Sequence, residues 1–270
     1  METQETIAPT TDVTTFKRVL VGVDDSPESL EAARQAATLA EGSITLVSAY
    51  DLTAGLVGGT APAVPAYLDE ERVREEAEAI VDRARAEIGD KPAAGRVDRG
   101  RPWELLLAEI ARWDDTLVAV GSHGHGRALG IVIGSTATEL IHKAPCSVLV
   151  ARTGLGRFPQ RIVVGLDGSP ESLVAYETAK SLAERFDAQF DPVVADVGED
   201  VDLEAIRRAA GDDVRGISDE PVSALVSLSA DADLVVVGSR GLRGVKALGS
   251  VSERVAHQAA SSVLVVRRTS

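Results

Sequence analysis

Aromatic residues are scarce in this sequence, and cysteine occurs once. Only 3% of the 270 residues are Phe, Trp or Tyr, so Val, Leu, Ile and Ala must fill the core. The single cysteine, Cys146, excludes an intrachain disulfide framework and a cysteine-rich metal site. Because Cys146 opens the strand-like apolar run 146–151, we interpret it as a small buried hydrophobic side chain.

Basic residues are outnumbered, and no long hydrophobic run is present. The chain has 28 Lys and Arg against 42 Asp and Glu, a formal net charge of −14. Nucleic acids and anionic membrane surfaces are bound by clustered basic side chains, so this balance argues against both partners. The longest uncharged stretch, 52–68, is broken by glycines and prolines and does not qualify as a membrane span. Residues 1–15 lack the apolar segment of a signal peptide, so we expect a loose tail there and a cytoplasmic protein.

What the sequence does contain is an internal repeat. Residues 21–30, VGVDDSPESL, return 143 positions later as 164–173, VGLDGSPESL. The segment 120–124, VGSHG, returns as 237–241, VGSRG, at an offset of 117. The falling offset means that the second copy is shorter by 26 residues in its middle. Two unequal copies of this length are domains rather than the short units of a solenoid.

We therefore predict two tandem domains, which agrees with a chain length above the usual size of one domain. The first domain is expected at 16–152, after the tail 1–15, and the second at 161–268. The segment 153–160 between them is a short linker with Gly and Pro breakers, so the two domains should be tied closely together.

Each copy alternates apolar strand-like segments with helical ones. Ser26-Pro27-Glu28 is helix-start chemistry, with a hydroxyl cap, a first-turn proline and an acid at the positive end of the dipole. Apolar residues at helical spacing from Val73 to Ile88 indicate a long second helix. In the first copy, strands are expected at 18–24, 44–50, 96–99, 116–120 and 147–151. Apolar strands separated by helices form a parallel sheet covered on both faces. The expected fold class is α/β, with two tandem doubly wound five-stranded parallel sheets.

Ligands of such sheets bind beyond the carboxyl ends of the strands. The fourth strand ends in the glycine-rich segment 121–127, GSHGHGR, and Gly134-Ser135-Thr136 begins the next helix. Glycines let the backbone approach a phosphate, hydroxyls add donors, and a helix N-terminus supplies free N–H groups and a positive dipole end. Asp24 ends the first strand, where a carboxylate can bind adenosine hydroxyls or help to hold a metal. A purely structural interpretation is also open, in which the glycine cluster forms a turn and Asp24 caps a helix. The recurrence of both features in the second copy weighs against it.

This pattern resembles a known family. Gly121, two residues, Gly124, nine residues and then Gly134-Ser135 match the Gly-2x-Gly-9x-Gly-[Ser/Thr] motif of ATP-binding universal stress proteins. The resemblance covers nearly the whole chain. It implies a Rossmann-like fold of the adenine nucleotide alpha hydrolase type and ATP as the ligand, with Mg²⁺ accompanying the ATP and no metal held by the protein alone.

The resemblance also implies an association of the two copies and a set of site residues. The copies should form a pseudo-twofold pair through their last strands, 147–151 and 262–266, and further association of whole chains into a homodimer is left open. The implied nucleotide-binding residues of the first copy are Gly22, Val23, Asp24, Ala49, Gly121, Gly124, Arg127, Gly134, Ser135 and Thr136. The glycines from Gly121 onward, with Ser135 and Thr136, would meet ribose and phosphates, and the first four residues would meet adenosine. We interpret the side chains of His123 and His125 as a solvated loop face.

The second copy departs from the motif. Its corresponding positions are Gly165, Leu166, Asp167, Ala195, Gly238, Gly241, Gly249, Ser250 and Val251. Only seven residues separate Gly241 from Gly249, and two lost residues remove up to about 7 Å of reach. We therefore expect the second copy to bind ATP more weakly than the first, or not at all.

The leading functional hypothesis is a binding module, a stress-response protein that signals through its nucleotide state or through protein partners that the sequence does not identify. A slow ATPase or self-phosphorylating protein is one alternative, and an interaction protein with vestigial nucleotide sites is another. No motif places a base beside a nucleophile and the Walker lysine motif is absent, so no catalytic residue is assigned.

Overall fold

The computed structural model describes residues 16–51, 70–112, 116–124, 133–154, 156–195, 202–239 and 250–268. The first half contains β1 (Arg18–Gly22), α1 (Pro27–Leu39), β2 (Ser43–Tyr50), α2 (Glu70–Glu87), β3 (Ala93–Arg99), α3 (Pro102–Ile110), β4 (Thr116–Gly121), α4 (Ser135–Lys143) and β5 (Ser147–Ala151). The second half contains β6 (Arg161–Leu166), α5 (Pro170–Phe186), β7 (Gln189–Ala195), α6 (Leu203–Ala210), β8 (Arg215–Ile217), α7 (Pro221–Ser229), β9 (Leu234–Gly238), α8 (Val251–Gln258) and β10 (Ser262–Val266).

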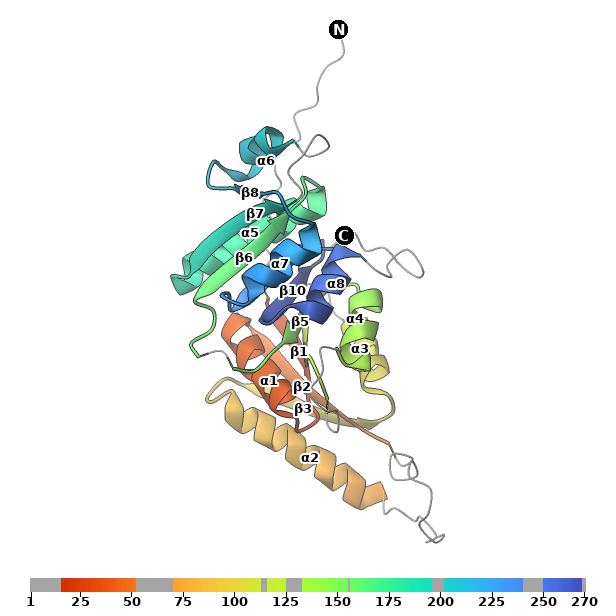
Figure 1. Ribbon diagram of the computed structural model, residues 1–270. Helices are drawn as coiled ribbons and strands as arrows, with labels where there is room; N and C mark the ends of the chain where they lie inside the picture. The colour runs from red at the N-terminus through yellow and green to blue at the C-terminus, as the bar shows by residue number, and fades with distance from the viewer. Residues whose placement is uncertain are drawn as a thin grey trace.

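The strands form one ten-stranded sheet in the order β3-β2-β1-β4-β5-β10-β9-β6-β7-β8 (Figure 1). Pairing is parallel within each half and antiparallel only between β5 and β10. Helices cover both faces, with α1, α2, α5 and α6 packed on one apolar core and α3, α4, α7 and α8 on the other. None of the described helices combines the length and apolar character required to cross a membrane. The predicted α/β class with tandem doubly wound halves is confirmed.

The β5–β10 pair relates the two halves by an approximate twofold rotation. Leu149 lies opposite Leu264, and the flanking pairs are Val148 with Val265 and Val150 with Val263. All residues of both strands are buried, so the pairing covers two edges that would otherwise invite aggregation. The expected pairing through the last strands is confirmed. The limits of the two domains and of the linker 153–160 stay predictions.

Two strands of the first half differ by more than one residue in their bounds from the sequence expectation, since β1 ends at Gly22 rather than at residue 24. β3 begins at Ala93 rather than at residue 96, because the pairing of Ile44 with Ala93 continues without a break to that of Tyr50 with Arg99. In the second half the shorter middle appears as α6, with 8 residues where α2 has 18, and as β8, with 3 residues. The helix and the strand at the outer edge are shorter by 10 and 4 residues, and the segment before the helix is shorter by 12, so most of the loss lies away from the pairing of the two halves.

Two arginines hold the halves together where β5 and β10 end. Arg152 donates hydrogen bonds through Nη1 to the carbonyl of Ser261, at 3.0 Å, and through Nη2 to the carbonyl of Ala256 in α8, at 2.6 Å. Its counterpart Arg267 donates through Nη2 to the carbonyl of Ile141 in α4. Each guanidinium thus meets the last turn of a helix from the other half, where carbonyls carry negative partial charge. Burial lowers the pKa of Arg152 to about 10.

Two histidines at equivalent positions face the same interface. His142 of α4 lies with Nε2 3.0 Å from Oε1 of Glu253 in α8. His257 of α8 has a buried Nε2 without a hydrogen-bond partner in the described part of the chain. Burial lowers the pKa of His257, against the opposing effect of the Glu253 carboxylate, and the charges of His142 and Arg152 lower it further. These effects together favour the neutral form of His257.

Acid should destabilise this interface through His257. Its pKa is lower in the folded chain than in the unfolded one, so the unfolded chain binds the proton more readily as the pH falls below the ordinary histidine value of about 6.5. The contribution of the neutral His257 side chain to the free energy of unfolding is therefore present above that pH and is lost as the pH falls below it. In His257→Gln the midpoint of urea unfolding should fall less between pH 7 and pH 5 than in the parent chain. Equal falls in both proteins, with His123→Gln as the control, would contradict this role.

Candidate functional site

A cavity of about 290 Å³ opens where β1, β2 and β4 end and α4 begins. Its wall includes every described member of the predicted first site, namely Gly22, Val23, Asp24, Ala49, Gly121, Gly124, Gly134, Ser135 and Thr136. Arg127 and His125 lie outside the described residues. The cavity occupies the carboxyl edge of the parallel strands, where doubly wound sheets bind their ligands.

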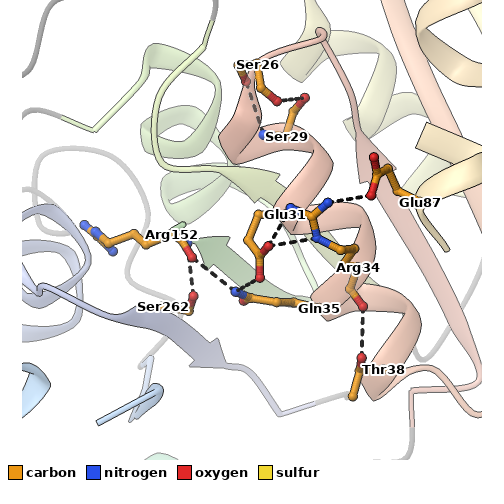
Figure 2. A network of polar contacts seen from close by, with 9 residues as sticks. All are labelled: Ser26, Ser29, Glu31, Arg34, Gln35, Thr38, Glu87, Arg152 and Ser262. Atoms are coloured by element: carbon orange, nitrogen blue, oxygen red, sulfur yellow. Dashed lines mark hydrogen bonds and ion pairs between the residues drawn. The ribbon is translucent and has the colours of Figure 1, made fainter. Parts of the chain in front are cut away.

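Asp24 is held in place by the start of α1. Its Oδ1 accepts hydrogen bonds from the N–H of Ser26 at 3.2 Å and from the Ser26 hydroxyl at 2.6 Å. The N–H of Asp24 donates to Oγ of Ser29 at 3.2 Å, and the Ser26 hydroxyl also caps α1 by accepting the N–H of Ser29 (Figure 2). The chain turns at Asp25, whose φ is +67°. One acidic side chain is therefore fixed at the edge of the cavity.

Glycine is needed at Gly121 and at Gly124 for different structural reasons. A Cβ on Gly124 would lie 2.6 Å from Oδ2 of Asp24, so glycine allows the loop to reach the carboxylate. A Cβ on Gly121 would lie 2.7 Å from the carbonyl carbon of Glu28, inside the first turn of α1. Gly121 is therefore required by the packing of β4 on α1, a role that the sequence motif does not reveal.

The N-terminus of α4 faces the cavity without a side-chain cap. Gly134 is its N-cap residue, with φ −65°, and supplies no side chain to the free N–H groups of the first turn. The first turn carries no acid, and the hydroxyl residues Ser135 and Thr136 line the cavity beside it. Free donors and the positive end of a helix dipole are the features that bind anions.

Several residues of the wall were missed by the sequence motif. They are Ser29, Val47, Pro102, Val120, His123 and Ala137. His123 was interpreted as solvated, whereas the structure places it in the wall with Nδ1 3.0 Å from the hydroxyl of Ser122. Val47 was detectable, because it lies two residues before Ala49 and shares its face of β2. Pro102 gave no signal, since it comes from α3.

The second half has a smaller equivalent cavity, of about 190 Å³, at the ends of β6, β7 and β9. Of the predicted second site it is lined by Gly165, Leu166, Asp167, Ala195, Gly238 and Val251. Ser250 is described but serves as the N-cap of α8, and Gly241 and Gly249 lie outside the described residues. Asp167 repeats the arrangement of Asp24. Its Oδ1 accepts hydrogen bonds from the N–H of Ser169 at 3.0 Å and from the Ser169 hydroxyl at 2.5 Å.

Comparisons of the sequence and of the structure with known proteins point to the same family. The model of the universal stress protein family matches residues 15–152 and 199–267. A universal stress protein of Mycobacterium tuberculosis is 29% identical over 290 residues, covering 93% of this chain and 96% of the relative, and one of Mycolicibacterium smegmatis is 30% identical over 287 residues, covering 92% and 96%. A universal stress protein of Archaeoglobus fulgidus has a similar fold, with a TM-score of 0.68 at 21% identity over 93% of this chain and 96% of that one.

Proposed function

The chain belongs to the universal stress protein family, and on that premise we propose that its first half binds ATP and that the protein acts as a nucleotide-dependent module of a stress response. The observation that carries the proposal is the first cavity. It combines a fixed carboxylate, a glycine loop and an uncapped helix N-terminus in one wall. A carboxylate suits the hydroxyls of a ribose, and free backbone donors suit phosphates.

The residues present fit such a ligand. The apolar side chains of Val47 and Ala49 would contact the base, and Asp24 would accept hydrogen bonds from the ribose. The phosphates would lie against Gly124 and the first turn of α4, including Ser135. ATP supplies the negative charge that this turn lacks. Within the described ranges no three His, Cys, Asp or Glu side chains gather around a metal position, so the proposal assigns Mg²⁺ to the phosphates.

Two substitutions test ATP binding in the first half. Asp24→Ala should weaken it by about 1–3 kcal/mol, or roughly 5- to 150-fold, because it removes a charged hydrogen-bond acceptor. Gly134→Val should weaken it more, because its methyl groups would occupy the approach to α4. A Cβ at Gly134 meets nothing closer than 3.6 Å, so this variant should fold.

Calorimetric titration with ATP is the measurement, and Asp167→Ala is the matched control that leaves the first cavity intact. Unchanged ATP affinity in folded Gly134→Val would refute the proposal. ATP turnover measured in the parent chain and in Asp24→Ala would separate a binding module from a slow ATPase. The protein partners and the cytoplasmic location stay predictions from the sequence, and the association of whole chains into a homodimer stays open.

A further inference from the structure

The outer edge of β3 is the long open edge of the sheet. The sheet ends in β3 on one side and in β8 on the other, and the described part of the chain places no strand beyond either (Figure 1). β8 has 3 residues, whereas β3 has 7 and contains no proline. Short edge strands discourage the addition of a further strand, and long ones promote it. β5 and β10 already cover each other, so β3 is the edge that can take a partner.

The hydrogen-bonding groups of this edge can be assigned residue by residue. The N–H of Gly100 donates to the carbonyl of Tyr50 in β2 at 3.1 Å. Backbone groups of alternate residues point to the same side of a strand, so the even-numbered residues of β3 direct theirs toward β2. The outer edge therefore carries the N–H and C=O groups of the odd-numbered residues, among them Gly95, Val97 and Arg99.

The edge also carries two opposite charges. Arg96 lies with Nε 2.6 Å from Oδ2 of Asp98, and its Nη1 contacts the carboxylate of Glu109 in α3. Both strand residues thus face the α3 side of the sheet, and their side chains are 36% and 42% exposed. Charges on an edge strand discourage pairing with arbitrary strands. A matching strand has to place an acid beside Arg96 and a base beside Asp98.

A second copy of β3 meets this requirement in one register. A twofold axis through Val97, perpendicular to the sheet, pairs the strands antiparallel, and each Val97 exchanges both hydrogen bonds with the other. Arg96 then lies opposite Asp98 of the second copy, in a non-hydrogen-bonded pair, where side chains are closest. An axis at Arg96 or at Asp98 would set like charges against each other. An axis at Gly95 would set Arg96 against Ala94 and leave its charge without a new partner.

Helix α2 fits the same arrangement. It packs on both β2 and β3, so its axis lies about half a strand spacing inside β3. Strands are about 4.8 Å apart, so the twofold axis lies about 2.4 Å beyond β3 and the two copies of α2 lie about 10 Å apart. A perpendicular axis keeps both helices on the same face of the sheet. Packed helices have axes about 8–10 Å apart, so the two copies of α2 can pack on each other.

A hollow of about 550 Å³ between α2 and β3 supplies the charged groups of this contact. Its α2 side is lined by a stripe of two bases and two acids, namely Arg74, Glu78, Asp82 and Arg85. Nε of Arg85 donates to the carbonyl of Ala93, a group of the outer edge, at 3.4 Å, so the stripe reaches over that edge. The stripe carries no net charge, and a second copy of it is therefore not repelled.

We propose that two copies of the chain associate through antiparallel pairing of their β3 strands about a twofold axis at Val97. The sheet of one copy then continues into the sheet of the other, as the first half continues into the second through β5 and β10. No residue of β3 or α2 lines the first cavity. The association is therefore independent of nucleotide and of the function proposed for that cavity.

Sedimentation equilibrium of the full chain without nucleotide tests the proposal. The parent chain should have twice the mass of one chain. Val97→Pro should halve the measured mass, because it removes the outward N–H at the axis and no hydrogen bond to β2. Val97→Ala keeps that N–H and is the matched control, which should stay at twice the mass. A parent chain of single mass would leave the edge to a strand of another protein and would overturn the proposal, as would a Val97→Pro variant that stays paired.

Exchanged charges test the register without proline. Arg96→Glu and Asp98→Arg, each alone, should have the mass of one chain, because each sets like charges opposite each other across the axis. Their equimolar mixture should recover twice the mass, since every acid then lies opposite a base. Circular dichroism equal to that of the parent chain shows that both variants are folded. Pairing of either folded variant by itself, or no recovery in the mixture, would show that the strands do not pair about Val97.

Discussion

Replacing Gly121 by alanine should lower the stability of the whole protein even when no nucleotide is present. The new Cβ would lie 2.7 Å from the carbonyl carbon of Glu28 and 2.8 Å from the nitrogen of Ser29. These are backbone atoms of α1, which its cap at Ser26 and its packing on β4 and β5 keep in position. Overpacking of this kind costs about 1–3 kcal/mol, and valine should cost more than alanine.

The midpoint of urea unfolding measures this effect, and Gly156→Ala is the matched control. A Cβ at Gly156 would meet nothing within 4 Å, so the control should unfold like the parent chain. The equivalent Gly238→Ala should behave like Gly121→Ala, because its Cβ would lie 2.6 Å from the carbonyl carbon of Glu171 in α5. Equal midpoints for Gly121→Ala and Gly156→Ala would show that Gly121 serves only the ligand.

The sequence predicts most of the fold because its signals there are local. The strands of the sheet centre are short apolar runs, and the helix starts at Ser26 and Ser169 carry their own caps. Strand β3 was less predictable, because its sequence, AAGRVDR, has no strong apolar pattern and its length follows from pairing with β2. The burial of Cys146, at 5% exposure, agrees with its interpretation from the sequence, and burial raises its pKa to about 12.

The site residues that directly follow strands were predictable from the sequence. Those whose position depends on tertiary packing were less predictable. The described motif residues of the first half all line one cavity, since strand ends of a parallel sheet meet at one edge. The capped start of α8 at Ser250 was not foreseen, because the repeat aligns Ser250 with Ser135, which lies inside α4. The same residue type thus lines one cavity and caps a helix in the other, and a shift of one position in the helix start makes the difference.

Contacts between the two halves leave the weakest trace in the sequence, because their partners lie more than 100 positions apart. The N–H of Arg152 in the first half donates to Oγ of Ser262 in the second half at 3.0 Å, and within the first half Gln35 of α1 donates to the carbonyl of Arg152 at 3.2 Å (Figure 2). Gln35 also donates to Glu31 at 2.9 Å. In Figure 2 the side chain of Arg152 extends away from this network. Its guanidinium donates to the carbonyls of Ser261 and Ala256 in the second half.

Replacing Arg267 by alanine should destabilise the protein by more than any change of an exposed arginine. Its side chain is 7% exposed and donates to the carbonyl of Ile141 across the approximate twofold. Loss of that donor leaves a buried carbonyl without its partner, which costs about 1–3 kcal/mol, and the lost aliphatic stem adds a packing defect. Arg267→Met should recover the packing part but not the hydrogen bond, so its urea midpoint should fall between those of Arg267→Ala and the parent chain. Arg268→Ala, the exposed neighbour, is the control. If Arg267→Ala and Arg268→Ala unfold at the same urea concentration, the hydrogen bond of Arg267 to Ile141 contributes nothing to holding the halves together.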